Sequence, residues 1–334
     1  MHSMNNPNFF LGIESTAHTF GASIVSNYGK ILSNEKDIYI PPTGKGIHPR
    51  DATQHHCEKS PQVIWRAFKE ANLNPKDLTA IAFSAGPGLG PSLRIGATIA
   101  RALASFLNKP LVPVNHAIGH IEIAFLTTGS KDPLVVLVSG GHTLITAYAG
   151  LRWRIFGETE DITIGNLLDM FAREIGLSPP SGVSVEQKAS YGKKLVELPY
   201  SVKGNDVTYS GLLSASLRRF RKGDRIEDLC YSLQEVSFSM FAETVERSLA
   251  HTEKKELLLT GGVAANKRLQ EMLRIIAKDH NSKFQVVDPK YSGDSGAQIA
   301  WAGYLAFKQG IRIDIDKSYV VPKWRLDEIE WKRL

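Results

Sequence analysis

The stretch that decides the fold is Phe9-Phe10-Leu11-Gly12-Ile13-Glu14-Ser15-Thr16-Ala17-His18-Thr19-Phe20-Gly21-Ala22-Ser23-Ile24-Val25-Ser26. Its two apolar runs flank a short polar bend, which predicts two β-strands joined by a tight turn. The pattern returns in Leu134-Val135-Val136-Leu137-Val138, Ser139-Gly140-Gly141-His142-Thr143 and Leu144-Ile145-Thr146-Ala147-Tyr148. The two stretches agree in pattern rather than identity, so they suggest an internal duplication in which each half opens with the same hairpin.

The composition restricts the class of protein. The chain has 334 residues, of which 43% are hydrophobic, enough for two domains of ordinary size. Cys57 and Cys230 lie far apart without C-x-x-C spacing, which favours a reducing compartment and argues against a disulfide framework. No apolar run approaches the length of a membrane span, about 18 residues, so we expect a cytoplasmic protein with no membrane partner. The net charge of +6 is compatible with a polyanionic partner.

The polar residues 127–132 mark the expected domain boundary. We expect an N-terminal domain over 1–130, with an insertion at about 37–75. A C-terminal domain over 131–310 would carry the nucleotide region and helical insertions, and 311–334 would be a tail that packs back on the core. In the first domain, a helix is predicted over about 92–107, and its expected core-facing residues recur at helical spacing: Ile95, Ile99, Leu103 and Phe106.

His116 and His120 form the most informative pair of polar residues. They follow the strand-like run Leu111-Val112-Pro113-Val114 and stand at i and i+4 of a predicted helix. Side chains at that spacing can bind one metal ion together, although two helix-face histidines without a ligand are the plain alternative. Ala117 replaces the Glu of the zinc-protease motif H-E-x-x-H, so a metalloprotease would lack its general base here.

Small-residue turns precede several predicted helices. Ser139-Gly140-Gly141 and Thr260-Gly261-Gly262 would let backbone N–H groups approach an anionic ligand closely. Asp294 precedes a helix predicted over 297–307, where capping the helix is the plain explanation of an aspartate. The densest basic cluster can be a solvated helix end or a contact to RNA phosphates: Arg218-Arg219-Phe220-Arg221-Lys222-Gly223-Asp224-Arg225.

The paired hairpins and the late Gly-Gly turn point to the actin-like, sugar-kinase and Hsp70 (ASKHA) architecture, an α/β fold. It has two ribonuclease-H-like domains with a nucleotide cleft between them. Nine ordered motifs narrow the resemblance: Gly12-Ile13-Glu14-Ser15-Thr16, Pro42-Thr43-Gly44-Lys45-Gly46-Ile47-His48-Pro49-Arg50, Gly86-Pro87-Gly88-Leu89, Asn115-His116-x-x-Gly119-His120, Val138-Ser139-Gly140-Gly141-His142-Thr143, Phe156-Gly157-Glu158-Thr159, Tyr209-Ser210-Gly211-Leu212, Gly261-Gly262-Val263-Ala264-Ala265-Asn266 and Asp294-Ser295-Gly296. With them the sequence closely resembles the TsaD-like tRNA N6-adenosine threonylcarbamoyltransferases, in the archaeal and eukaryotic form that is the catalytic subunit of the KEOPS complex.

The resemblance implies an activity and a metal site. The family transfers a threonylcarbamoyl group from threonylcarbamoyl-AMP to N6 of the adenosine 3′ of the anticodon, in tRNAs that read codons starting with A. His116 and His120 match its metal-binding histidines, and Asp294 matches a carboxylate ligand expected from the other half of the molecule. The ion would be iron or zinc, with magnesium as an option beside nucleotide. No catalytic residue is assigned beyond this site.

The resemblance also implies a nucleotide site, which threonylcarbamoyl-AMP, ATP, ADP or AMP would occupy. The phosphate region matches the end of the second hairpin's first strand and its turn: Leu137, Val138, Ser139, Gly140 and Gly141. Asp169, Gly182 and Glu186 match the residues that receive the ribose and neighbouring groups, and Asn266 matches the residue beside the adenine. Leu137 stands where archaeal members often have a Tyr, so no phenolate ligand is expected.

The implied partners are tRNA and the other subunits of a KEOPS complex. A small dimerising Pcc-type subunit would dock on helices of the N-terminal half. A Bud-type kinase or ATPase would be separate or fused at the C-terminus, and a further small KEOPS subunit would associate indirectly. An ASKHA-type ATPase or kinase, and a nucleotide-binding scaffold subunit, remain the alternative functions.

Overall fold

The computed structural model describes residues 7–42 and 44–332, so Thr43 of the second motif and both extreme ends of the chain lie outside the described residues. Contacts between Cα atoms divide the chain into two compact units. The first unit contains the chain up to Ile40, Ile47–Leu126 and the chain from Asp294 onward. The second contains Pro41–Gly46 and Thr127–Gly293.

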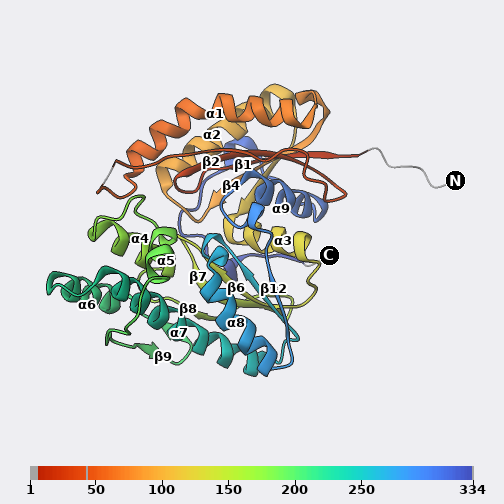
Figure 1. The fold of residues 1–334 in the computed structure, drawn as a ribbon. Helices are drawn as coiled ribbons and strands as arrows, with labels where there is room; N and C mark the ends of the chain where they lie inside the picture. Colours follow the sequence, from red (N-terminus) through yellow and green to blue (C-terminus); the bar gives the residue numbers. More distant parts are fainter. Residues whose placement is uncertain (1–6, 43, 333–334) are drawn as a thin grey trace. The chain divides into compact units, whose positions relative to one another are not determined.

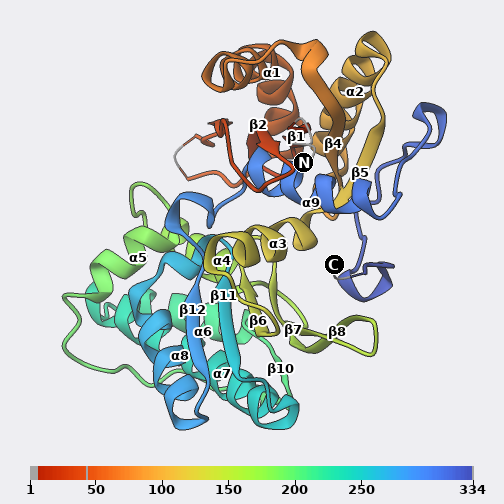
Figure 2. The same ribbon diagram turned by 90° about the vertical axis from the view of Figure 1, so that its right-hand side faces the viewer.

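The first unit is built on a five-stranded sheet with the order β3-β2-β1-β4-β5; Figure 2 labels β2, β1, β4 and β5 in this order. Its strands are β1 (Phe9–Glu14), β2 (Thr19–Ser26), β3 (Glu35–Ile38), β4 (Leu78–Gly86) and β5 (Leu111–Asn115). The predicted hairpin is confirmed, because β1 pairs antiparallel with β2 from Phe9↔Ser26 to Glu14↔Gly21. β1, β4 and β5 run parallel, and their apolar runs are buried as expected for strands covered on both faces.

Helices cover both faces of this sheet. Figures 1 and 2 show α1 (Pro49–Ala71) and α2 (Gly90–Leu107) on one face and α9 (Gly296–Lys308) on the other. α3 (His116–Thr128) starts directly after β5. The described part of the chain also contains five short 3₁₀ helices, η1 (Pro75–Asp77), η2 (Gly262–Ala265), η3 (Pro289–Tyr291), η4 (Ile315–Lys317) and η5 (Leu326–Glu328).

The buried face of α2 differs from the prediction. The helix forms where it was expected, but its buried residues are mostly small, and Phe106 is 87% exposed. A Cβ atom at Gly96 would lie 1.9 Å from Ser15 Oγ, so the helix backbone sits very close to the end of β1. The interpretation of Ile95, Ile99, Leu103 and Phe106 as the core face was therefore wrong for Phe106. Ile99 and Leu103 are half-buried and pack against the core, as expected. The fully buried positions are mostly small residues, because the backbones approach closely there.

α9 packs against the first sheet as tightly as α2 does. A Cβ atom at Gly12 of β1 would lie 2.2 Å from both Ala300 N and Gly296 O. The helix contacts β1, β2, β4 and β5. The domain boundary expected at residue 310 would have placed α9 with the second half, whereas its contacts place it in the first unit.

The chain after α9 also packs within the first unit. Ile313 pairs with Leu111 at the edge of β5, and Val321 N donates a hydrogen bond to Ala85 O of β4 at 2.7 Å. The buried Trp331 donates from Nε1 to Glu122 Oε1 of α3 at 2.9 Å. The tail therefore braces the helix that carries the two histidines.

The second unit repeats the strand arrangement of the first. Its sheet has the order β12-β11-β6-β7-β8 (Figure 2). The strands are β6 (Leu134–Val138), β7 (Thr143–Ala149), β8 (Arg152–Glu158), β11 (Glu256–Thr260) and β12 (Lys283–Val286). In both units the first strand forms a hairpin on one side and pairs parallel with a later strand on the other. This shared topology confirms the second predicted hairpin and agrees with an internal duplication.

Five helices and a small hairpin complete the second unit. They are α4 (Ile164–Glu174), α5 (Gly182–Ala189), β9 (Val202–Lys203), β10 (Asp206–Val207), α6 (Ser210–Arg221), α7 (Ile226–Thr252) and α8 (Lys267–Asp279). α7 is the longest and contacts α5, α6 and α8. Among the described residues, no helix combines the length and apolar character needed to cross a membrane.

Candidate functional site

Three predicted metal ligands converge at one buried point of the first unit. His120 Nε2 lies 3.1 Å from His116 Nε2 and 3.2 Å from Asp294 Oδ1, and His116 Nε2 lies 3.4 Å from the same carboxylate oxygen. The two imidazoles are almost completely buried. Two imidazole nitrogens and a carboxylate oxygen are a donor set that suits zinc or iron, so the residues present fit a bound ion.

The end of β5 sets the position of the first histidine. Asn115, the last residue of the strand, accepts hydrogen bonds at Oδ1 from Ala117 N and Ile118 N, and so caps the start of α3. Its Nδ2 donates to Trp324 O in the tail at 3.1 Å. His116 is therefore the first residue of a helix whose N-terminus is fixed from both sides.

Gly119 brings α3 close to α9. A Cβ atom at this position would lie 3.2 Å from Gln298 Cγ and 3.3 Å from Ile299 Cδ1, tighter than ordinary side-chain contact. Because Asp294 precedes α9, the separation of the two helices sets the distance from the carboxylate to the histidines. The glycine between the histidines thus has a packing role in the same site.

Glu14 is a supporting residue that the sequence analysis did not assign to the metal site. Its side chain is fully buried, and Oε2 lies 2.9 Å from His116 Nδ1. Oε1 accepts hydrogen bonds from Thr16 N and Thr16 Oγ1 at 2.6 and 2.5 Å. A proton held on Nδ1 by Glu14 leaves the Nε2 lone pair of His116 directed at the other two ligands, the arrangement of a carboxylate–histidine–metal triad.

The electrostatics of the site depend on its carboxylates. Burial lowers the pKa of His116, but Glu14 and Asp294 offset this and raise the pKa to about 10. Burial lowers the pKa of His120. Burial opposes the ionised form of Asp294, yet the neighbouring His116 charge and hydrogen bonds hold its pKa well below the usual range. In the absence of an ion, a second proton on His116 Nε2 therefore balances the carboxylates. A metal ion would have to displace this Nε2 proton, while the proton on Nδ1 stays with Glu14.

The structure corrects the expected origin of Asp294. We expected this ligand from the other half of the molecule, so that the ion would join two domains. Asp294 instead lies in the first unit with both histidines, because α9 packs on the first sheet. The capping explanation is also wrong, since Ser295 is the N-cap residue of α9.

The second hairpin turn lies at the carboxyl ends of two parallel strands. Ser139 Oγ accepts hydrogen bonds from Gly141 N and His142 N, while Gly140 and Gly141 are exposed. The turn after β11 is adjacent: Gly261 has a φ of +96°, and a Cβ atom there would lie 2.2 Å from Val138 O. Ligands of α/β sheets bind at such strand ends. The side chains of Leu137 and Val138 are buried in the sheet, so any contact from them would use the backbone.

The other predicted nucleotide residues form a connected set within the second unit. Asp169 Oδ1 accepts a hydrogen bond from Gly182 N, and Glu186 Oε1 accepts one from Lys267 N, both at 2.8 Å. Asn266 caps α8 through Oδ1 and donates from Nδ2 to Gln234 Oε1. These contacts join α4, α5 and α8. Their nucleotide roles stay predictions.

Comparison with known proteins gives consistent relatives. The family model described as "TsaD: tRNA N6-adenosine threonylcarbamoyltransferase" matches residues 29–301. Proteins of that name from Caldivirga maquilingensis and Sulfurisphaera tokodaii are 50% and 52% identical, over 96% of this chain and 96% and 97% of theirs. A "probable bifunctional tRNA threonylcarbamoyladenosine biosynthesis protein" of Methanocaldococcus jannaschii is 50% identical, and the match covers 96% of this chain but 59% of that protein.

Solved structures of low sequence identity show the same fold. T. kodakarensis HypF aligns with a TM-score of 0.65 at 16% identity, covering 91% of this chain and 48% of that one. The activator of 2-hydroxyisocaproyl-CoA dehydratase from Clostridium difficile aligns with a TM-score of 0.54 at 12% identity, covering 90% of this chain and 96% of that one. Together with the two five-stranded sheets, these likenesses confirm the predicted ASKHA-type fold.

Proposed function

Because this chain belongs to the TsaD family of tRNA N6-adenosine threonylcarbamoyltransferases, we propose that its transfer reaction uses a divalent ion held by His116, His120 and Asp294. The substrate of the family is tRNA. The donor is proposed to be threonylcarbamoyl-AMP, and the acceptor N6 of the adenosine 3′ of the anticodon, in tRNAs reading codons that start with A.

The observation that carries this proposal is the convergence of the three ligand atoms. All lie within 4.8 Å of one another, next to a buried carboxylate that fixes the orientation of His116. His116 and His120 would bind the ion, iron or zinc, through Nε2, and Asp294 through Oδ1. When bound, such an ion supplies Lewis-acid polarisation of a donor oxygen. Glu14 would hold the proton on His116 Nδ1 throughout.

The reaction demands orientation more than a strong base. An adenine N6 amine is a poor nucleophile, whereas AMP is a good leaving group. The new bond joins N6 to the carbamoyl carbon, the bond from that carbon to the phosphate oxygen breaks, and N6 loses one proton. The protein must therefore align the two substrates and stabilise the charge that develops on the carbamoyl oxygen and phosphate.

We propose that the second unit supplies the nucleotide site. Exposed Gly140 and Gly141 beside buried Ser139 would bind the donor phosphate through backbone N–H groups. Gly140 N would donate directly, and Gly141 N would exchange its hydrogen bond to Ser139 Oγ for one to the phosphate. The Asp169–Gly182 and Glu186–Lys267 contacts would shape the ribose region, with Asn266 beside the adenine. ATP, ADP and AMP would compete for this site, and magnesium would accompany the triphosphate.

The partner proposals rest on exposed apolar residues and on a longer relative. Trp65 of α1 is 61% exposed and Phe106 of α2 is 87% exposed, which suits docking of a small Pcc-type subunit on these helices. The longer bifunctional relative supports a Bud-type kinase as partner, and a further small KEOPS subunit would join indirectly. Trp65→Ala with Phe106→Ala should abolish co-purification with the small subunit. Ile275→Ala on α8, a matched exposed apolar residue, should leave it intact.

Transfer of labelled threonylcarbamoyl from its adenylate to tRNA, with partners supplied, tests the proposal. The wild-type chain should transfer the label, and a folded His116→Ala variant should not. Equal transfer by both proteins would remove the ion from the mechanism. Hydrolysis of ATP without transfer by either protein would instead favour an ATPase or a scaffold subunit.

A further inference from the structure

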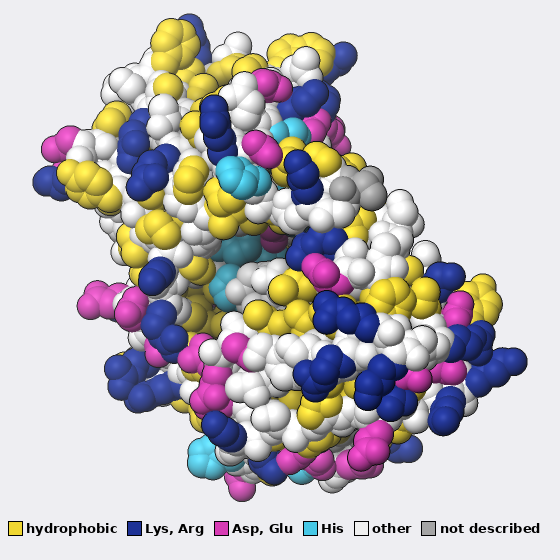
Figure 3. All heavy atoms as spheres, turned by 90° about the vertical axis from the view of Figure 1, so that its left-hand side faces the viewer, with side chains coloured by type: hydrophobic (Ala, Val, Ile, Leu, Met, Phe, Trp, Pro, Cys, Tyr) yellow, Lys and Arg dark blue, Asp and Glu magenta, His cyan; other side chains and the backbone are white. Residues whose placement is uncertain are grey.

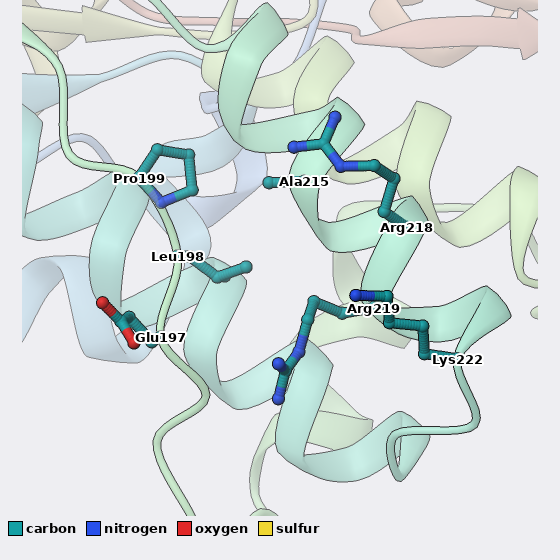
Figure 4. Close-up of a pocket in the computed structure, with 7 residues that line it drawn as sticks. All are labelled: Glu197, Leu198, Pro199, Ala215, Arg218, Arg219 and Lys222. Atoms are coloured by element: carbon teal, nitrogen blue, oxygen red, sulfur yellow. The ribbon is translucent and has the colours of Figure 1, made fainter.

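The C-terminal end of α6 borders a hollow in the surface of the second unit. Figure 4 shows α6 on one side of this hollow and the 197–199 segment on the other. Its volume is about 310 Å³. The residues around it combine cations with small apolar groups and one acid: Arg218, Arg219, Lys222, Leu198, Pro199, Ala215 and Glu197.

Three exposed basic side chains at the end of α6 form no ion pair among the described residues, and two of them, Arg218 and Lys222, line the hollow. Arg219 pairs with Asp224, and Arg225 pairs with Glu227 at 3.0 Å. Within residues 7–42 and 44–332, no ion pair involves Arg218, Arg221 or Lys222, and all three are exposed. The acidic groups of this region thus neutralise other cations and leave these three unmatched.

The helix end accounts for only part of this charge. Basic residues commonly occupy the last turn of a helix, because the macrodipole places roughly half a negative charge there. Arg218 and Lys222, the two unmatched cations that line the hollow, carry more positive charge than the helix end, with roughly half a negative charge, and Glu197 supply together. The surface around the hollow therefore keeps a positive potential.

The face drawn in Figure 3 is the side of Figure 1 on which α6 is labelled, and over it Lys and Arg are interspersed with Asp and Glu. The end of α6 combines two features: a hollow, and cations beside it that form no ion pair among the described residues. Together they suit an anionic ligand.

We propose that this hollow binds the phosphodiester backbone of the tRNA substrate, with Arg218 and Lys222 contacting phosphates. The two residues stand at i and i+4, on one face of the helix end and next to the hollow. Leu198, Pro199 and Ala215 give the wall an apolar surface against which a ribose or base can lie. Proteins that bind single-stranded or looped RNA combine such a positive groove with apolar contacts. The inference rests on the proposed function, since it concerns the same tRNA.

Binding of unmodified tRNA to the full-length chain, measured by fluorescence anisotropy across a KCl titration, tests the proposal. The double variant Arg218→Gln, Lys222→Gln should weaken binding about tenfold or more. It should also reduce the slope of log Kd against log salt by about 2, one for each lost phosphate contact. The matched control is Lys255→Gln with Lys278→Gln, which removes two charges from exposed lysines elsewhere in the same unit. The control should bind as the wild type does.

An unchanged affinity and salt slope in the Arg218/Lys222 variant would overturn the proposal, as would an equal loss in the control. Loss of binding to an acidic protein partner, with tRNA binding intact, would assign the hollow to that partner instead. In transfer assays the variant should raise the KM for tRNA and leave kcat near the wild-type value. Failure of the wild type to transfer would contradict the proposed function, whereas the binding measurement would still report on the hollow.

Discussion

The proposed metal centre of the first unit and the proposed nucleotide region of the second are built by different means. Glu14, His116, His120 and Asp294 are separated along the chain and meet through side-chain atoms in a buried place. In the second unit the side chains of the predicted residues mainly accept hydrogen bonds from the backbone. Ser139 Oγ accepts one from an N–H group of its own turn, and Asp169 and Glu186 accept theirs from main-chain N–H groups of other segments. The first region depends on which side chains are present, and the second on the path of the backbone.

This difference predicts different sensitivities. Removing a side chain from the first region should remove a ligand or its support. Adding a side chain to a turn of the nucleotide region should obstruct the ligand. It should not remove any protein group that binds the ligand. Substitutions in the two regions should therefore separate metal affinity from donor affinity.

The largest effect concerns a second buried histidine of the first unit, which contrasts with His116. His56 donates a hydrogen bond from Nε2 to Ala17 O, and its neighbours are His55 and His18 instead of two carboxylates; Asp37 contacts His55. Burial, followed by the charge of His55, lowers the pKa of His56 from 6.5 to about 4. The unfolded chain therefore binds more protons between these values, and stability falls as pH falls from 6.5 to 4.

This shift corresponds to about 3 kcal/mol of unfolding free energy. Urea unfolding of the wild type should show a lower free energy of unfolding at pH 4 than at pH 7. In His56→Gln this decrease should be smaller by about that amount. The comparison of two proteins removes the contribution of other titrating groups. Identical pH dependence in the two proteins would show that His56 is not held neutral.

Glu14→Gln should weaken metal binding by about 10- to 100-fold, because an amide supports the Nδ1 proton of His116 less strongly than a carboxylate does. Competition with a chromophoric chelator measures this affinity directly. Glu122→Gln is the matched control, since Glu122 is also buried on α3 but bonds to Trp331. The control should keep the metal affinity of the wild type. Equal affinities for the Glu14 variant and the wild type would remove Glu14 from the site.

Gly141→Ala should have the smallest effect of the three substitutions. The effect should be confined to donor binding in the second unit and should not alter metal binding in the first. No atom lies within 4 Å of the position of its Cβ, so the fold should accept the methyl group. The added methyl group should, however, clash with a donor phosphate that lies against the turn. The KM for threonylcarbamoyl-AMP should therefore rise about tenfold, equivalent to ~1.4 kcal/mol. Gly211→Ala, which is equally unobstructed at the start of α6, is the control. A changed metal content in Gly141→Ala would contradict the separation of the two regions.

Local patterns predicted the parts of the fold that depend on neighbours in sequence. The hairpins of β1–β2 and β6–β7 followed from alternating apolar runs and small-residue turns, and the His116–His120 pair followed from helical spacing. The buried face of α2 did not, because close packing of Gly96 on Ser15 reversed the usual preference for large apolar residues. Which residues are buried at such a close contact depends on the distance between the helix and the strand. That distance cannot be read from the sequence.

The supporting contacts of the metal centre could not be predicted for a related reason. Glu14 and His116 are 102 positions apart, and only the parallel pairing of β1, β4 and β5 brings the ends of their strands together. The unit to which Asp294 belongs depended on where α9 packs, and its small residues fit the first sheet. Motifs identified the ligands, whereas the topology determined which unit holds them.

His116, His120 and Asp294, all in the first unit, are proposed to bind one ion. The most direct measurement is the metal content per chain, by mass spectrometry, of anaerobically purified wild type, His120→Ala and Asp294→Asn, with circular dichroism to verify folding. We expect about one iron or zinc ion per wild-type chain and almost none in either folded variant. Equal metal content in the wild type and both variants would contradict this proposal.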